Sequence, residues 1–211
     1  MKKAFAVLKA LNQKYARTFH QREDPFFVLI FTVLSARNRD LQTYKAANAL
    51  FKSFPNMQKL AAAKTKHVEA TIKFIGLYRQ KAKRVKGIAQ QLLQKYGGKV
   101  PSEMNELLKL PGVGRKTASC VLIYAYNKPA IAVDTHVHRI TNRIGLVATK
   151  TPEQTERALM QLYPKEMWLD INEVFVKHGQ QICLPQKPKC PVCPIKNYCS
   201  YYEKVFKPSF R

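Results

Sequence analysis

Four of the five cysteines in this chain lie within residues 183–199. They are Cys183, Cys190, Cys193 and Cys199, with six, two and five residues between them. Four thiolates at this spacing can close around one metal centre. Zinc sites with four cysteines usually contain two CxxC pairs, whereas here only Cys190 and Cys193 form one. The spacing therefore favours a [4Fe–4S] cluster, which is larger than a single ion, over the alternative of zinc.

The chain carries 37 lysine and arginine residues against 13 acidic ones, a formal net charge of +24. This excess predicts a polyanionic partner, with nucleic acid favoured over an anionic membrane surface. No uninterrupted apolar stretch approaches the ~20 residues that a membrane-spanning helix needs. Residues 1–19 are basic and amphipathic, which indicates a first helix rather than a signal peptide. We therefore expect a cytoplasmic, nucleoid-associated protein, in which clustered cysteines bind metal rather than form disulfides.

A second informative segment is ELLKLPGVGRKTASCVLIYAY, residues 106–126. It predicts a helix that ends at Leu110, a tight turn over residues 111–114, and a second helix that begins near Arg115. Glycine in the turn permits positive φ and the close approach of another backbone. The first amides of the second helix carry the positive end of its dipole and suit a phosphate. A plain connection between core helices is the alternative, but the net charge favours phosphate binding.

Most of the chain has the apolar spacing of three to four residues that is typical of helices. Residues 85–93 are an example, and residues 151–154, Thr-Pro-Glu-Gln, have the pattern of a capping box at a helix start. Glycine and proline turns, such as those at 97–98 and 111–114, separate the helical stretches. The sequence predicts an all-α protein.

Three of these segments together resemble the endonuclease III family of helix-hairpin-helix DNA glycosylases. LPGVGRKTA, residues 110–118, is similar to the family's helix-hairpin-helix. VDTHVHRITNR, residues 133–143, resembles its Gly/Pro-loop-plus-aspartate segment, and the cysteine spacing resembles its [4Fe–4S] cluster loop. With FIGLYRQKAKRV and HGQQICLP, the resemblance runs from about residue 25 to residue 200, in the family's order.

The resemblance implies two helical lobes with a DNA-binding cleft between them. One lobe is expected over residues 21–131 with the helix-hairpin-helix, and the other over residues 1–20 and 132–211 with the cysteine loop. The implied partner is double-stranded DNA with damaged bases or abasic sites, bound by a monomer. No membrane partner is expected.

The resemblance also implies a catalytic pair. Lys116 matches the position of a lysine that attacks the sugar carbon and forms an imine, which requires the neutral amine. From the residues alone, a lysine that is solvated or contacts phosphate is the alternative, because the chain holds 37 basic side chains. Asp134 has the position of a helix N-cap and, by resemblance, is the family's essential aspartate. There its carboxylate would stabilise positive charge at the glycosidic carbon or assist deprotonation of the nucleophile.

An enzyme that acts on a base within duplex DNA must extrude that base and fill the gap. The resemblance points to the LSARNRD turn, residues 34–40, as the wedge, where many relatives have glutamine in place of Arg37. Phosphate contacts are expected from the turn and from the segment after Asp134, with the alternative that one of His138 and Arg139 is a polar residue satisfied by packing within the protein. The expected DNA-binding residues are Gly112, Val113, Gly114, Arg115, Arg37, His138 and Arg139.

The expected function is a bifunctional DNA glycosylase and AP lyase that removes oxidised or ring-saturated pyrimidines and nicks the strand by β-elimination. A glycosylase of the same fold with mismatch or other base specificity is one alternative. A non-catalytic, metal-stabilised DNA-binding protein is another, and it would bind DNA with steep salt dependence yet release no base. A protein that binds anionic membrane surfaces is the weakest alternative, because membrane binding would explain neither the turn at residues 111–114 nor the spacing of the cysteines.

Overall fold

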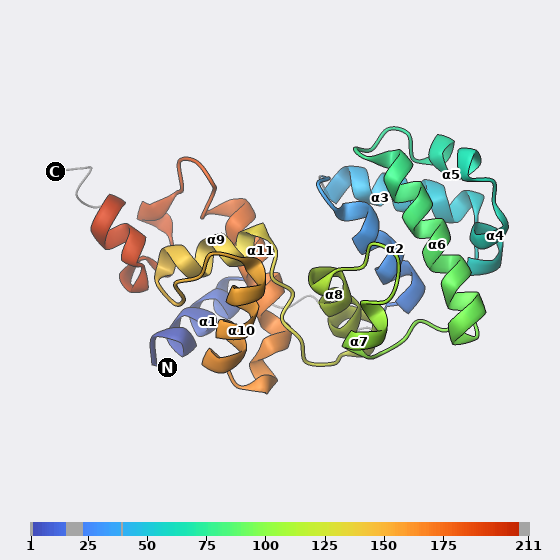
Figure 1. The fold of residues 1–211 in the computed structure, drawn as a ribbon. Coiled ribbons are helices and arrows are strands. Elements are labelled where there is room, and N and C mark those ends of the chain that lie inside the picture. The colour runs from blue at the N-terminus through green and yellow to red at the C-terminus, as the bar shows by residue number, and fades with distance from the viewer. Residues whose placement is uncertain (1, 16–22, 39, 207–211) are drawn as a thin grey trace. The chain divides into compact units, whose positions relative to one another are not determined.

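The computed structural model describes residues 2–15, 23–38 and 40–206 of the chain. Every regular element in these ranges is helical, so the prediction of an all-α protein is confirmed for the described residues (Figure 1). The α-helices are α1 (Lys2–Lys14), α2 (Pro25–Ser35), α3 (Asp40–Ser53), α4 (Met57–Ala62), α5 (Thr65–Thr71), α6 (Tyr78–Tyr96), α7 (Met104–Leu107), α8 (Arg115–Tyr126), α9 (Thr135–Ile144), α10 (Pro152–Leu162) and α11 (Trp168–Gln181). A short helical turn, η1 (Lys165–Met167), lies between α10 and α11, and three more follow α11 at η2 (Cys190–Val192), η3 (Lys196–Tyr198) and η4 (Tyr202–Phe206).

The chain divides into two compact units, and each is described here by itself. The central unit consists of Gln21–Asn127, and the terminal unit joins Met1–His20 to Lys128–Arg211. None of the described helices is both long enough and apolar enough to cross a membrane.

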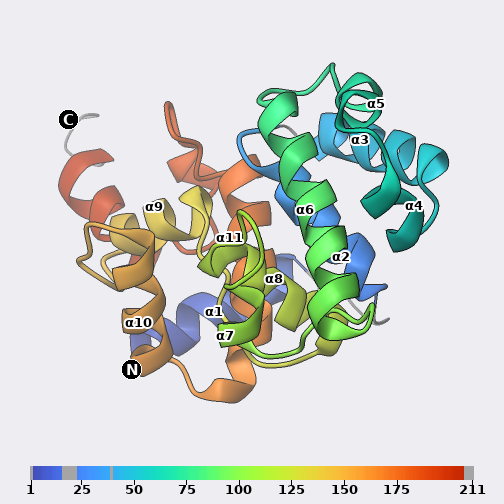
Figure 2. The same cartoon turned by 45° about the vertical axis from the view of Figure 1, so that its right-hand side comes forward.

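The central unit is built around α2, which is apolar on nearly all sides. Its start is fixed locally, because Pro25 occupies the first turn and the Asp24 side chain accepts a hydrogen bond from the Phe27 amide at 2.7 Å. Helix α2 packs against α3, α6 and α8, while α4 and α5 cover α6 (Figure 2). A helix buried by several neighbours needs no polar face, which explains the unbroken apolar sequence PFFVLIF.

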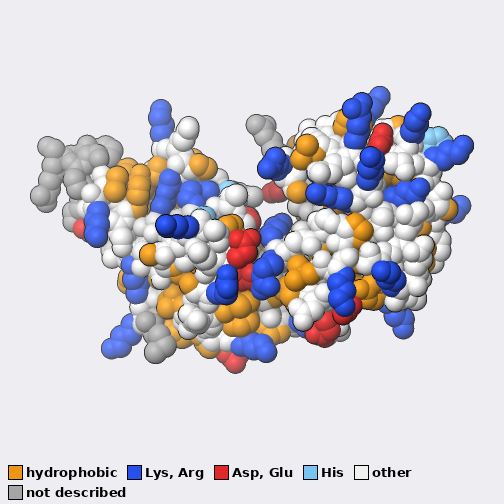
Figure 3. All heavy atoms as spheres, viewed as in Figure 1, with side chains coloured by type: hydrophobic (Ala, Val, Ile, Leu, Met, Phe, Trp, Pro, Cys, Tyr) orange, Lys and Arg blue, Asp and Glu red, His pale blue; other side chains and the backbone are white. Residues whose placement is uncertain are grey.

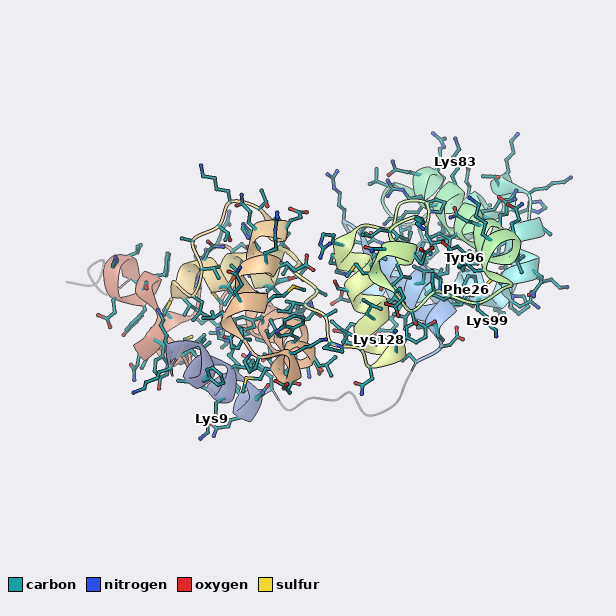
Figure 4. All side chains as sticks on the ribbon, turned by 60° about the horizontal axis from the view of Figure 1, so that its bottom comes forward. Lys9, Phe26, Lys83, Tyr96, Lys99 and Lys128 are labelled. Carbon is teal, nitrogen blue, oxygen red and sulfur yellow. The ribbon has the colours of Figure 1, made fainter. Side chains whose placement is uncertain are left out.

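The terminal unit has its own apolar core, to which the first helix and the C-terminal segment both contribute. Helix α1 supplies Ala4, Val7, Leu8 and Leu11, which recur at helical spacing, while Lys9 on its other face is exposed (Figure 4). The Tyr163 hydroxyl donates to the Ala4 carbonyl at 3.0 Å and fastens α1 to the end of α10. The rest of this core comes from α9, α10 and α11, and from Tyr15, Ile131, Val133, Tyr163 and Ile195 outside these helices.

Local start signals that the sequence predicts are present in this unit. Thr151 caps α10 through its hydroxyl, which accepts from the Gln154 amide at 3.2 Å, and the Gln154 side chain accepts from the Thr151 amide in return. The predicted capping box is therefore confirmed.

Candidate active site and metal-binding loop

The helix-hairpin-helix lies in the central unit, where α7 and α8 flank the turn at residues 111–114. The Val113 amide donates to the Leu110 carbonyl at 3.1 Å, and the Val113 side chain is buried. Gly112 and Gly114 on either side are exposed, and Gly112 has a φ of +71°. Valine thus anchors the turn in the core, and the left-handed backbone at Gly112 is a conformation that glycine adopts without strain.

Helix α8 begins directly after Gly114, and no side chain caps its first turn. The Ala118 amide donates to the Gly114 carbonyl at 2.9 Å, which is the first hydrogen bond of the regular helix. The amides before it have no partner within the helix and carry the positive end of its dipole. The predicted turn therefore presents the backbone geometry of an anion site.

Lys116 lies in this first turn of α8. Its side chain is half-buried, whereas its neighbour Arg115 is exposed. Within the described residues, no carboxylate pairs with the Lys116 amine and no hydrogen bond holds it. An amine that is partly shielded and not engaged in an ion pair can act as a nucleophile once it loses its proton.

Asp134 lies in the terminal unit and caps α9, as the sequence predicts. One oxygen, Oδ1, accepts from the backbone amides of His136 and Val137, each at 2.9 Å. The other oxygen has no hydrogen-bond partner among the residues that the structure describes. The cap fixes the orientation of the carboxylate and leaves one oxygen free for a ligand.

Arg139, a predicted phosphate contact, is half-buried and bonded within the protein. Its Nη2 donates to the Cys183 carbonyl at 2.8 Å and to the Gly179 carbonyl at 3.4 Å, and it lies 3.1 Å from Nδ1 of His136. Burial lowers the pKa of this guanidinium, and the nearby Arg143 adds to the effect. These bonds tie α9 to α11 and to the cysteine loop, so a DNA contact by Arg139 stays a prediction.

His138 is also engaged internally, because its Nδ1 lies 2.6 Å from the Thr155 hydroxyl on α10. Its contact with DNA stays a prediction as well.

His136 packs so closely on α11 that a methyl group at Gly179 would approach its Nδ1 to 2.5 Å. This contact was not predicted, since nothing local in the sequence marks Gly179 as a contact site.

Arg37, the predicted wedge, is exposed just after α2 and has a φ of +55°. Residue 39 of the predicted wedge segment lies outside the described residues. A second turn lies beside Arg37, because a Cβ at Gly76 would be 4.0 Å from the Arg37 carbonyl oxygen. The next residue, Leu77, also has a left-handed backbone and is 51% exposed. Leu77 was not predicted as a site residue, and its position after Gly76 and before α6 is the only signal that the sequence offers for it.

The four clustered cysteines interact electrostatically with one another. Burial, together with the other three thiols, raises the pKa of Cys193 to about 11, and burial and two of these thiols raise that of Cys190. The thiols are held by the end of α9 and by α11: Arg143 Nη1 donates to Cys183 Sγ at 3.6 Å, and Cys193 Sγ lies 3.6 Å from His178 Nε2. Such thiols lose their protons only beside a strong positive centre.

No three or more His, Cys, Asp or Glu side chains in the described ranges form a group that could hold a metal ion. The donor set nevertheless fits an iron–sulfur cluster chemically, because it consists of four soft sulfur ligands from one short loop. The loop is ordered by backbone bonds from Cys193 to Cys190 at 3.2 Å and from Cys199 to Lys196 at 3.0 Å. Two lysines of the loop, Lys187 and Lys189, are exposed, so it presents cations to solvent.

Basic side chains are distributed over both units (Figure 3). On the face drawn, acidic side chains form only small groups among them. This agrees with the formal charge of +24 and suits a polyanionic partner for each unit taken separately.

Residues 30–165 match the HhH-GPD superfamily, described as base excision DNA repair proteins. The chain is 52% identical over 208 residues to endonuclease III of Thermotoga maritima, covering 97% of this chain and 98% of that protein. It matches a solved structure of a trapped covalent endonuclease III–DNA intermediate with a TM-score of 0.91 and 35% identity, covering 100% of this chain and 98% of the other. It also matches the structure of a thermostable thymine-DNA glycosylase with a TM-score of 0.84 and 30% identity, covering 96% and 98% of the two chains.

Proposed function

Because the chain belongs to the HhH-GPD superfamily of base excision DNA repair proteins, we propose that it is a bifunctional DNA glycosylase and AP lyase of the endonuclease III type. The observation that carries the proposal is the position of Lys116: a half-buried lysine, whose amine has no partner among the described residues, in the uncapped first turn of α8. The match to a trapped covalent endonuclease III–DNA intermediate supports chemistry of this kind.

The first step is the capture of the DNA backbone. The turn at 111–114 and the first amides of α8 bind one phosphate without reading the bases. Exposed lysines such as Lys187 and Lys189 add attraction that does not depend on sequence and weakens with salt. Duplex DNA with a damaged base or an abasic site is the substrate.

Base removal needs a nucleophile and a stabiliser of positive charge. The Lys116 amine attacks C1′ of the sugar while the bond to the base breaks and the base leaves with a proton. The free oxygen of Asp134 either stabilises the charge that develops at C1′ or takes a proton from the attacking amine.

Strand cleavage follows from the covalent adduct. Ring opening of the sugar gives an imine between C1′ and Lys116, which makes the C2′ proton acidic. Loss of that proton expels the 3′ phosphate by β-elimination, and water then hydrolyses the imine and returns the amine. Lys116 is therefore required both for covalent attachment to DNA and for the nick.

The extruded base leaves a gap that side chains must fill. Arg37 and the exposed Leu77 come from adjoining turns in the central unit, and together they offer a charged donor and an apolar wedge. Oxidised or ring-saturated pyrimidines are the proposed substrates, because poor stacking lowers the energy of extrusion. A monomer in the cytoplasm, acting at the nucleoid, is the proposed form of the enzyme.

Cys183, Cys190, Cys193 and Cys199 would hold a [4Fe–4S] cluster. The cluster would supply iron ions that coordinate the four thiolates and would shape the loop around them. The chain's own contribution is the basic surface of that loop and the Arg143 guanidinium, which donates to Cys183 Sγ and to the Leu184 carbonyl at 2.7 Å.

A second candidate is a glycosylase of mismatched bases on the same fold. The observation that favours it is the match to a thymine-DNA glycosylase at a TM-score of 0.84, which shows that this fold hosts another base specificity. Lys116 distinguishes the two, since an enzyme that only removes the base needs no imine-forming amine.

Borohydride trapping tests the proposal on two duplexes, one with an abasic site and one with thymine glycol. The purified protein should form a covalent adduct with both, and Lys116→Ala should form neither. An adduct with the abasic duplex alone would support the lyase activity, but it would mean that the enzyme removes a base other than thymine glycol. Tight binding without any adduct would overturn the imine mechanism.

A further inference from the structure

One edge of α6 supports the hairpin in the central unit. Pro111 packs on Gly87, where a Cβ would meet the proline ring at 3.4 Å. One turn further along, Gln91 Nε2 donates to the Lys109 carbonyl at 3.2 Å. Arg84, one turn before Gly87, lies on the same edge and reaches the turn itself at Gly112.

The contact between Arg84 and Gly112 is very close. A Cβ at Gly112 would lie 2.4 Å from Cδ and 2.6 Å from Nε of Arg84. Since Nε is part of the guanidinium, the charged group itself lies against the left-handed residue of the turn. Gly112 thus serves two purposes: it adopts a φ of +71°, and it leaves space for the arginine.

Nothing in the described ranges neutralises this arginine. Arg84 is half-buried, and it has no ion pair or hydrogen bond with any described residue. An arginine whose Cδ and Nε pack on a turn, and which has no partner in the part of the chain that the structure describes, keeps the donors of its two terminal nitrogens available to a ligand. Its position beside the turn that precedes the uncapped start of α8 favours an anion.

We propose that Arg84 is a phosphate-binding residue, which together with the Gly112–Gly114 turn and the first amides of α8 forms a single site for one DNA phosphate. The inference rests on the proposed function for the identity of the anion. The planar guanidinium matches two phosphate oxygens, while the backbone amides approach the same group from the turn. Arg84 acts on binding and positioning and takes no part in bond breaking.

Salt-dependent binding separates this role from a structural one. The probe is a duplex with a tetrahydrofuran abasic analogue, which cannot be cleaved, and Kd is measured over a series of KCl concentrations. Arg84→Met keeps the stem that packs on Gly112 but removes the charge. We expect Arg84→Met to bind several-fold more weakly. The slope of log Kd against log salt should be smaller by the contribution of about one phosphate contact.

Lys83→Met is the matched control, because Lys83 is the adjacent cation on α6 and is exposed (Figure 4). It should leave the slope unchanged, and Arg84→Lys should keep the parent slope because it retains the charge. An unchanged slope in Arg84→Met, or equal losses in Arg84→Met and Lys83→Met, would overturn the proposal. Arg84→Gln gives the same test if the thermal unfolding of Arg84→Met shows that it does not fold.

The outcome is separable from that of the proposed function. A parent protein that binds this duplex through Arg84 but gives no borohydride adduct would overturn the lyase mechanism and leave the phosphate site in place. If the parent protein gives the adduct and Arg84→Met keeps the parent slope, the phosphate site at Arg84 would be overturned and the lyase mechanism would stand.

Discussion

The guanidinium of Arg143, in the last turn of α9, donates to the sulfur of Cys183 over 3.6 Å. The same side chain donates to the Leu184 and Pro185 carbonyls at 2.7 Å each. It also lies over the Tyr201 ring, 5.0 Å from its centre. One arginine therefore fastens the start of the cysteine loop to a core helix and places a positive charge beside the Cys183 sulfur.

Arg143→Ala should weaken retention of the proposed cluster. The substitution leaves two carbonyl groups without their donors, at about 1–3 kcal/mol each where they are shielded from water. Iron content per chain and visible absorption, followed during incubation with a chelator, should fall faster than in the parent. Lys189→Ala is the control, since it removes an exposed cation of the same loop and should lose iron at the parent rate. Equal rates for the parent and Arg143→Ala would contradict the role of Arg143.

Asp134→Asn should keep the N-cap hydrogen bonds of α9 and remove the negative charge that the proposed catalysis needs. The amide oxygen of asparagine can still accept from the His136 and Val137 amides, so thermal unfolding should stay near that of the parent. Base release in a single turnover should fall by roughly 10²-fold or more, because the negative charge is lost. Asp134→Ala should lose the activity and, in addition, about 1 kcal/mol of stability. Base release at the parent rate in Asp134→Asn would rule out the catalytic role.

The two caps, at Asp134 and Thr151, show what the sequence alone could predict. Each depends on residues within three positions, so composition and spacing are sufficient. The all-α architecture follows in the same way from apolar periodicity. The turn before Arg115 was also predictable, because proline and glycine restrict the backbone locally.

Contacts between distant segments were not predictable. Arg139 has the sequence signature of a phosphate-binding cation, yet it donates to carbonyls at Gly179 and Cys183 on another helix and its following loop. Arg84 looks like any cation on a basic helix until the fold brings Gly112 against its stem. In a chain with 37 basic residues, charge alone cannot distinguish a structural arginine from a ligand-binding one.

Gly179→Ala should destabilise the terminal unit. The added methyl group would lie 2.5 Å from Nδ1 of His136, so the imidazole must move away from the Arg139 guanidinium. Overpacking of this kind costs about 1–3 kcal/mol, which urea unfolding can measure. Gly87→Ala is the matched control within a helix, because its methyl group would meet Pro111 at an ordinary 3.4 Å. That variant should be as stable as the parent or more stable, and equal losses in both variants would refute the steric explanation.

Lys81 gives a prediction about pH. Its side chain is 1% exposed in the central unit, and Nζ has no hydrogen-bond partner among the described residues. Burial lowers the pKa of this amine, whereas an unfolded lysine titrates near ~10.4. Between the two values the unfolded chain binds more protons than the folded chain, so this group makes stability rise with pH.

Lys81→Met keeps the length of the side chain and removes the titration. At pH 7 it should raise the free energy of unfolding by about 1–3 kcal/mol, since no polar group is then buried without a partner. The advantage over the parent should shrink as the pH rises from the lowered pKa of the folded state towards ~10.4, because the folded parent has released a proton that its unfolded chain still holds. Lys83→Met, at an exposed position, should follow the parent at every pH. Urea unfolding at pH 7, 8 and 9 measures the difference, and parallel curves for the parent and Lys81→Met would show that Lys81 is solvated or paired in the folded protein.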